Sequence, residues 1–191
     1  MGSSYYANPI IFLMDTLFSL YILAVMLRFL LQWVSGDFYN PISQFLVKIT
    51  HPPLKLLRRV IPSIGRIDTA SVVLMVLLKM ISGWLIFVLQ GSASPAEAIF
   101  VWSIMELIGL LIDIFVVVIL IQVVLSWVNP GTYNAAISLI YSLSEPLLST
   151  VRNVIPPLGG IDFSPLVVLI GLQLLKMLLF PPMAQLISML S

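Results

Sequence analysis

Long apolar segments alternate with shorter polar ones along the chain, and this alternation predicts four membrane-crossing helices. The apolar segments cover residues 9–34, 69–90, 96–128 and 164–190. Each is at least as long as the roughly 20 residues that a helix needs to cross the hydrocarbon core. The first has no basic residue ahead of it and exceeds a signal-peptide core in length, so we expect it to remain as a membrane span.

The polar segments in the two halves of the chain are copies of one another. Residues 33–68 and 127–162 align without a gap at a constant offset of 94 positions, and 13 of the 36 aligned residues are identical. A repeat of this length is a structural unit used twice. We therefore expect an all-α membrane protein of two parallel tandem repeats, residues 1–94 and 95–191, in one compact domain. The shared pairs include Trp33 and Trp127, Pro52 and Pro146, Arg58 and Arg152, Pro62 and Pro156, Gly65 and Gly159, and Asp68 and Asp162.

Within each copy, apolar residues recur at helical spacing on both sides of a proline, which predicts a pair of short amphipathic helices. Thr50 and Ser144 are expected to cap the second helix of each pair, with Pro52 and Pro146 in its first turn. The pair either lies in the membrane interface or packs as a cap on the ends of the spans. The apolar face of the first helix is expected to comprise Ile42, Phe45, Leu46 and Ile49.

Each copy closes with the motif IPxxGxID. Its proline is expected to end the second short helix, and its glycine permits a turn that other residues resist. Asp68 and Asp162 stand directly before the next span, where a carboxylate can cap the first amides of a helix. Alternatively, the two aspartates form a cation-binding or catalytic pair. We expect Arg58 and Arg152 to bond to carbonyls or to these aspartates.

Basic residues predict the orientation in the membrane. The second copy contains Arg152, whereas the first contains Lys48, Lys55, Arg58, Arg59 and Arg66. The positive-inside rule places both copies in the cytoplasm and both termini in the periplasm of a bacterial inner membrane. The basic cluster in the first copy would attract anionic lipids at the inner leaflet. The alternative is a docking site for a cytoplasmic partner.

Composition supports the bilayer as solvent and leaves little room for catalysis. Of the residues, 60% are hydrophobic and 9% are charged, whereas soluble domains carry about 25% charged residues. The net charge of +1 gives no reason to expect nucleic-acid binding. There is no cysteine, and His51 is the single histidine. We expect His51 to be a surface residue; it could bind a metal or haem only if a methionine supplied a second ligand. We find no phosphate loop or zinc-binding spacing, and we expect no cofactor, metal or enzymatic activity.

Ionisable residues inside the spans predict one ion pair. They include Asp15, Arg28, Lys79, Asp113 and Lys176. Asp113 lies 14 residues before Trp127, and Lys176 lies 14 residues after Asp162, which places both about 21 Å from the cytoplasmic boundary. A charge at this depth is normally paired or set in a wet cavity, so we expect these two to pair, with Lys79 as the rival partner for Asp113. Alternatively, the charges line a route for a proton or cation.

The doubled IPxxGxID motif resembles the YggT/YlmG family, also called the YGGT repeat family. The resemblance covers nearly the whole chain and implies a small multi-pass membrane protein. It also implies a link to osmotic or potassium tolerance in bacteria and to cytochrome-complex maturation in plastids, with no established enzymatic activity. The chain departs from a strict repeat where Gln122 stands in the place of Arg28.

Function is therefore predicted as a non-enzymatic membrane scaffold or assembly factor. Its partners would be the lipid bilayer with its anionic lipids, and a membrane protein or a second copy of the chain. The alternative is a potassium or proton pathway that contributes to osmotic tolerance. Such a pathway requires polar side chains aligned through the core, and the spans contain a modest number of them.

Overall fold

The computed structural model describes residues 3–92, 94–128, 134–156 and 162–190, and over these residues the chain is helical, with no β-strand. The fold is therefore all-α, as the hydrophobic pattern predicted. Its helices are α1 (Ser3–Trp33), α2 (Pro41–Leu57), α3 (Thr69–Leu89), α4 (Ala96–Val128), α5 (Ala135–Arg152) and α6 (Ser164–Leu190).

Four of the helices, α1, α3, α4 and α6, are long and apolar enough to cross a membrane, with mean hydropathy between 2.0 and 3.0 over their most apolar windows. Their apolar side chains point outward as well as inward. In α6, 6% of that window is buried inside the protein. A surface this apolar is unsuited to water, so the architecture is that of a membrane protein.

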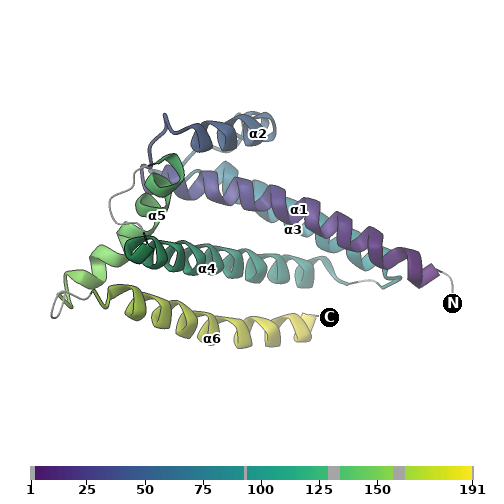
Figure 1. Cartoon of the computed structure of the whole chain (residues 1–191). Helices are drawn as coiled ribbons and strands as arrows, with labels where there is room; N and C mark the ends of the chain where they lie inside the picture. The colour runs from purple at the N-terminus through teal and green to yellow at the C-terminus, as the bar shows by residue number, and fades with distance from the viewer. Residues whose placement is uncertain (1–2, 93, 129–133, 157–161, 191) are drawn as a thin grey trace.

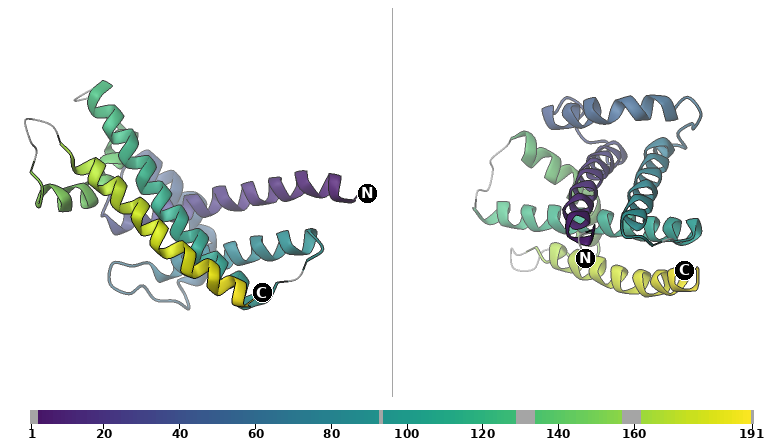
Figure 2. Two further views of the ribbon diagram at one scale, coloured as in Figure 1. Left: turned by 90° about the horizontal axis from the view of Figure 1, so that it is seen from below. Right: turned by 90° about the vertical axis from the view of Figure 1, so that its right-hand side faces the viewer.

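The long helices form two antiparallel hairpins, α1 with α3 and α4 with α6, one from each half of the chain (Figure 1). The hairpins meet mainly through α3 and α4, and they cross obliquely (Figure 2). The described chain ends lie at one end of the hairpins, and α2 and α5 lie at the other (Figure 1). All four spans can therefore connect the same two sides of a membrane.

Small residues allow the long helices to approach closely. A Cβ atom on Gly83 of α3 would lie 2.7 Å from the Trp102 ring of α4, and one on Gly109 of α4 would lie 3.0 Å from the Phe180 ring of α6. Ser82 is 2% exposed beside the first of these contacts. Such small residues are typical of packed interfaces between membrane helices.

Each repeated segment forms one continuous helix, so the prediction of two short helices with a bend between them is wrong. α2 continues through Pro52 and Pro53, and α5 continues through Pro146. A proline leaves the carbonyl four residues earlier without its helical donor. For Pro53 that carbonyl belongs to Ile49, and it accepts a hydrogen bond from the Tyr21 hydroxyl of α1 at 3.2 Å. Contact with α1 thus helps α2 to tolerate its prolines.

The residues that cap these helices also differ from the prediction. Thr50 and Ser144 lie inside α2 and α5, where each hydroxyl bonds to a carbonyl four residues earlier (2.6 and 2.7 Å). The caps are Asn40 and Asn134, whose side chains accept hydrogen bonds from amides in the first turns of α2 and α5, both at 2.9 Å. Asn40 also donates to the Ala135 carbonyl at 2.7 Å, which joins the start of α2 to the start of α5.

The turn after α2 partly follows the sequence prediction. Gly65 has a φ of +60°, in the region that favours glycine. However, α2 ends at Leu57 and α5 at Arg152, so Pro62 and Pro156 lie beyond the helix ends and do not set them. Gly159 lies outside the described residues.

The face of α2 that is buried against the protein coincides only in part with the predicted apolar face. It contains Leu46 together with Ser43, Thr50 and Leu54, whereas Ile42 and Phe45 are 39% and 60% exposed. Leu54 of α2 and its counterpart Leu148 of α5 are both 0% exposed. The helix therefore has an inner face of mixed polarity and apolar side chains on its outer face.

Candidate functional site

A polar contact ties each short helix to the long helix that precedes it. Arg28 of α1, which is 8% exposed, donates from Nη1 to Thr50 Oγ1 of α2 at 2.8 Å. At the equivalent positions of the second repeat, the Gln122 side chain of α4 is hydrogen-bonded to Ser144 of α5. Replacement of arginine by glutamine thus retains the interhelical contact but removes the charge.

A second contact ties the end of α2 to the start of α3. Arg58 Nη2 lies 2.6 Å from Asp68 Oδ2, and the Asp68 side chain is 2% exposed. Burial of Asp68 opposes ionisation, but hydrogen bonds from Arg58 and Ser71 lower the pKa of its carboxyl below the usual value. The predicted Arg–Asp bond is present. The side chain makes no bond to the backbone amides of α3, so its predicted role as a helix cap is wrong.

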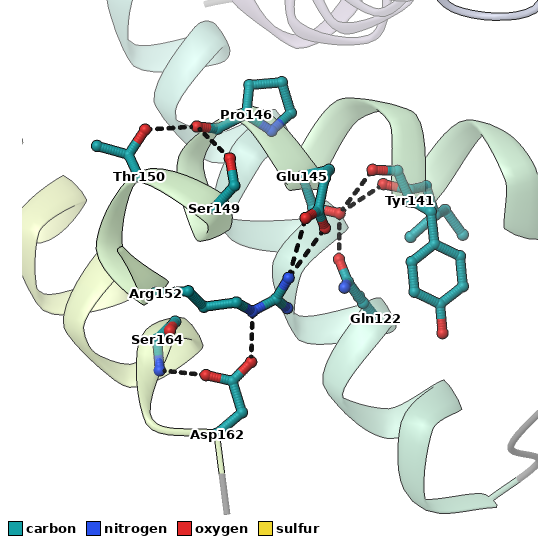
Figure 3. Close-up of polar contacts among 11 residues, drawn as sticks. Gln122, Tyr141, Glu145, Pro146, Ser149, Thr150, Arg152, Asp162 and Ser164 are labelled. Carbon is teal, nitrogen blue, oxygen red and sulfur yellow. Dashed lines mark hydrogen bonds and ion pairs between the residues drawn. The ribbon is translucent and has the colours of Figure 1, made fainter. Parts of the chain in front are cut away.

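The equivalent contact in the second repeat is more exposed and has an additional member. Arg152 lies between Asp162 and Glu145 (Figure 3), with Nε 2.8 Å from Asp162 Oδ2 and Nη1 3.0 Å from Glu145 Oε1. Asp162 also accepts from the Ser164 amide at 2.8 Å, so here the predicted cap is present. Partial burial of Asp162 raises the pKa of its carboxyl, but hydrogen bonds from Ser164 and Arg152 outweigh this effect and lower the pKa below the usual value. The predicted Arg–Asp bond thus occurs in both repeats.

A cavity of about 770 Å³ lies beside these contacts in the first repeat. Its walls come from the C-terminal part of α1, the inner face of α2 and the turn that leads to α3. Ionisable and hydroxyl groups share the lining with apolar side chains. Among them are Arg28, Asp37, Ser43, Arg58 and Asp68.

Deeper in the hairpins, the predicted ion pair is present. Lys176 Nζ of α6 lies 2.7 Å from Asp113 Oδ1 of α4. Lys79, the rival partner, instead lies 3.5 Å from Glu106 of α4 and 4.8 Å from the centre of the Trp102 ring. Both pairs line a second cavity of about 230 Å³ between the hairpins. Within the described part of the chain, Asp15 takes part in no ion pair.

The remaining predicted residues lie at the surface. Trp33 and Trp127, at the ends of α1 and α4, are 42% and 82% exposed. His51 is exposed on α2, and across the described residues no three histidine or carboxylate side chains cluster as a metal site would require. The basic residues Lys55, Arg59 and Arg66 are also exposed.

Sequence reasoning missed three groups that the structure brings together. These are the Arg28–Thr50 contact, the Asn40 cap and the buried Ser43 hydroxyl. The first could have been found, because positions 28 and 50 and positions 122 and 144 keep the same separation and complementary polar side chains in both copies. No comparable signal marks Ser43, since Ile137 stands at its place in the second copy.

One protein-family model matches the sequence of the chain twice. The family model described as CCB3/YggT matches residues 7–89 and again residues 101–183. The chain belongs to the CCB3/YggT family. Each of the two matches covers most of one span-to-span unit, α1 to α3 or α4 to α6, and contains one of the Arg–Asp contacts.

Relatives of similar length occur in bacteria. An uncharacterized protein of Pseudomonas aeruginosa is 42% identical, over 94% of this chain and 92% of its own. An uncharacterized protein of Vibrio alginolyticus is 39% identical, over 90% and 94% of the two chains. The uncharacterized protein YggT of Escherichia coli K12 is 38% identical, over 89% and 88%. No solved structure matches the chain.

Proposed function

We propose that this CCB3/YggT-family protein is a non-enzymatic scaffold of the bacterial inner membrane. In this proposal α2 and α5 lie at the cytoplasmic face and hold lipids or a membrane-protein partner in place. The observation that carries the proposal is the doubled Arg–Asp contact, which fixes each short helix to the span that follows it. A rigid pair of outward-facing helices is suited to holding a partner and has no evident use in a reaction.

The distribution of charge supports the orientation. The segment that contains α2 has five basic residues and the segment that contains α5 has Arg152, whereas the connection between α3 and α4 has none. Cytoplasmic segments carry an excess of lysine and arginine. Both termini would then be periplasmic. A reporter fused after Ser191 should be active in the periplasm and one inserted near Gly36 in the cytoplasm, and the reverse pattern would overturn the orientation.

Exposed apolar side chains support lipid or protein contact along the short helices. Phe45 and Leu56 of α2 are 60% and 63% exposed, and Tyr141 of α5 is 40% exposed. On α2, Phe45 and Leu56 share the helix with the exposed Lys48 and Lys55, which would favour anionic lipids at the inner leaflet. The outer surface of α2 therefore combines apolar contact area with positive charge, which suits the boundary between headgroups and acyl chains.

Photo-crosslinking in cells tests the scaffold. A photoreactive residue at position 45 should form discrete protein adducts, including adducts with a second copy if the scaffold is an oligomer. The same residue at position 54 is the matched control, because Leu54 is 0% exposed on the inner face of the same helix. Adducts with lipid alone at position 45 and at position 141 would replace the protein partner by lipid, and no adducts above the position-54 control would refute the scaffold.

An ion pathway is the second candidate, and the cavity between the hairpins favours it. Lys79, Glu106, Asp113 and Lys176 line this cavity, and charges inside a membrane often mark ion routes. Purified protein in potassium-loaded liposomes distinguishes the candidates. The scaffold predicts leakage equal to that of protein-free vesicles. Leakage above that level, altered by Lys176→Met, would reverse the ranking.

A further inference from the structure

Arg28 is the buried cation of the first repeat whose charge is not balanced by contact. Its residue is 8% exposed, and across the described part of the chain it forms no ion pair. It donates from Nη1 to Thr50 and, at 3.4 Å, to the Val47 carbonyl. A guanidinium has five N–H donors, so Nε and Nη2 retain donors for another group. A buried charge normally has a partner, which points to an anion from outside the chain.

Ser43 supplies a second unpaired group in the same cavity. Its Oγ atom is buried and, among the described residues, has no hydrogen-bond partner. Ser43 and Arg28 face the cavity from different helices, α2 and α1. A hydroxyl buried without a partner costs free energy. Both groups would be satisfied by one acceptor that enters the cavity.

The other charges around the cavity do not neutralise Arg28 by direct contact. Asp68 is bonded to Arg58 and to Ser71. Asp37 is exposed, and its carboxylate accepts from the Tyr39 amide at 2.8 Å. The lining thus contains two cations, Arg28 and Arg58, and two carboxylates, of which Asp68 is bonded to Arg58 and Asp37 is exposed.

The second repeat lacks each of these features at the equivalent positions. Gln122 replaces Arg28, and Ile137 replaces Ser43. Tyr141 replaces Val47, which lines the cavity in the first repeat. The helix-to-helix contact persists without them, because Gln122 still bonds to Ser144. Arg28 and Ser43 are therefore not required to assemble a repeat, which favours a ligand role for them.

We propose that the cavity of the first repeat binds a phosphate group, with Arg28 as its cation and Ser43 as a hydroxyl donor. Arg28 lies five residues before Trp33, or about 7.5 Å from the end of α1. This inference rests on the proposed placement of α2 at the membrane interface, a depth at which lipid phosphates lie. The phosphate could be that of a lipid headgroup or a free ion, and the two sources can be distinguished by experiment.

The test uses the whole protein in a nonionic detergent and three probes. These are dihexanoyl phosphatidylglycerol, inorganic phosphate, and dihexanoylglycerol, which has the same acyl chains but no phosphate. The readout is the thermal unfolding midpoint, because a ligand that binds the folded state alone raises it. We expect the phospholipid to raise the midpoint and dihexanoylglycerol to leave it unchanged.

Arg28→Gln should require a phospholipid concentration at least about tenfold higher for the same rise, because a charge-assisted bond is lost. The second repeat contains glutamine at this place, so the variant is expected to fold. Lys48→Gln is the matched control, since it removes the same charge from an exposed position of α2 outside the cavity. If Arg28→Gln fails to fold, Ser43→Ile takes its place, since isoleucine is the residue of the second repeat at this position. It too should require a higher phospholipid concentration for the same rise in the unfolding midpoint.

Each result supports or overturns the site. An Arg28-dependent rise with phospholipid alone assigns a lipid headgroup, and an Arg28-dependent rise with inorganic phosphate as well assigns the phosphate group itself. An equal rise with dihexanoylglycerol, an unaltered response in the variant, or no rise in the unsubstituted protein would overturn it. None of these results depends on the crosslinking or liposome leakage that tests the proposed function.

Discussion

The two repeats share their interhelical contacts but differ in what surrounds them. In both, a polar pair ties the short helix to the preceding span, and an arginine ties its end to the aspartate before the next span. Leu54 and Leu148 are both 0% exposed at equivalent positions. These shared contacts are enough to explain why the same fold unit forms twice.

The differences lie in groups that the fold unit does not need. The first repeat has Arg28, Ser43 and Val47 in the lining of a cavity, and the second repeat has Gln122, Ile137 and Tyr141 at the equivalent positions. The second repeat has the Asp113–Lys176 pair where the first has Ser19 and Ser82. The shared contacts therefore hold each short helix in the place that the proposed scaffold requires, and the unshared groups are candidates for roles that only one repeat has. The four predictions below test this division, starting with the largest expected effect.

The Arg–Asp contacts should differ in strength between the repeats. Arg58→Ala should lower the free energy of unfolding by about 3 kcal/mol or more, because it leaves a buried carboxylate without its cation. Asp68 is 2% exposed, whereas Asp162 is 33% exposed, so Arg152→Ala should cost about 1 kcal/mol or less. SDS-driven unfolding in mixed micelles measures both. The control is the double variant Lys48→Ala and Lys55→Ala. Equal losses of unfolding free energy in all three proteins would show that the two arginines contribute no more to stability than other basic residues at this face.

Charge reversal tests the ion pair that the second repeat alone contains. Asp113→Lys or Lys176→Asp should each lower the folded yield, because an unpaired charge at this depth costs at least about 2.5–3.5 kcal/mol. The double variant should recover the yield, since the pair is restored with reversed polarity. The control combines Asp113→Lys with Lys79→Asp. Recovery in that control alone would show that Asp113 pairs with Lys79, and recovery in neither would show that no pair matters.

The sequence predicted the spans and three of the ion pairs, the two Arg–Asp contacts and Asp113–Lys176, because each rests on a local rule. Apolar length defines a span, and depth counted from a repeated boundary brings Asp113 level with Lys176. The Arg58–Asp68 and Arg152–Asp162 bonds followed from their equal spacing in two copies. These features need no knowledge of how the hairpins cross.

Features that depend on packing could not be predicted in the same way. A bend was expected at Pro52, yet α2 continues through Pro52 and Pro53. Tyr21 of α1 bonds to the carbonyl that Pro53 leaves without its helical donor. Asp68 was expected to cap α3, but the nearby Arg58 and Ser71 take its carboxylate instead. The cavity depends on the space between three segments, which residue spacing does not reveal.

Acidification should weaken the first repeat more than the second. The pKa of Asp68 is lowered in the folded protein, so its contribution is fully present above the unfolded pKa, about 3.9. This contribution is lost as the pH falls through the folded value. The thermal unfolding midpoint should therefore decrease when the pH is lowered below about 4. Asp68→Asn should reduce this pH dependence of the midpoint more than Asp162→Asn does. An equal reduction in both variants would show that the greater burial of Asp68 does not determine the pH dependence of stability.

The smallest effect concerns the prolines of α2. Pro53 leaves the Ile49 carbonyl without its helical donor, and Tyr21 supplies a hydroxyl instead. The second repeat has Phe115 and Leu147 at the equivalent positions, and a leucine has the amide that proline lacks. Tyr21→Phe should therefore cost about 1 kcal/mol in the unsubstituted protein, but less in a Pro53→Leu background, where the helix satisfies this carbonyl itself.

A double-mutant cycle on these two positions isolates the coupling from other effects of either change. Phe115→Tyr is the matched control, because a hydroxyl added to the second repeat finds no carbonyl freed by a proline at position 147, and it should give no gain in stability. Equal losses from Tyr21→Phe in both backgrounds would show that the tyrosine acts by packing alone. A loss confined to the Pro53 background would instead establish that α1 supplies the hydrogen bond by which α2 remains one continuous helix.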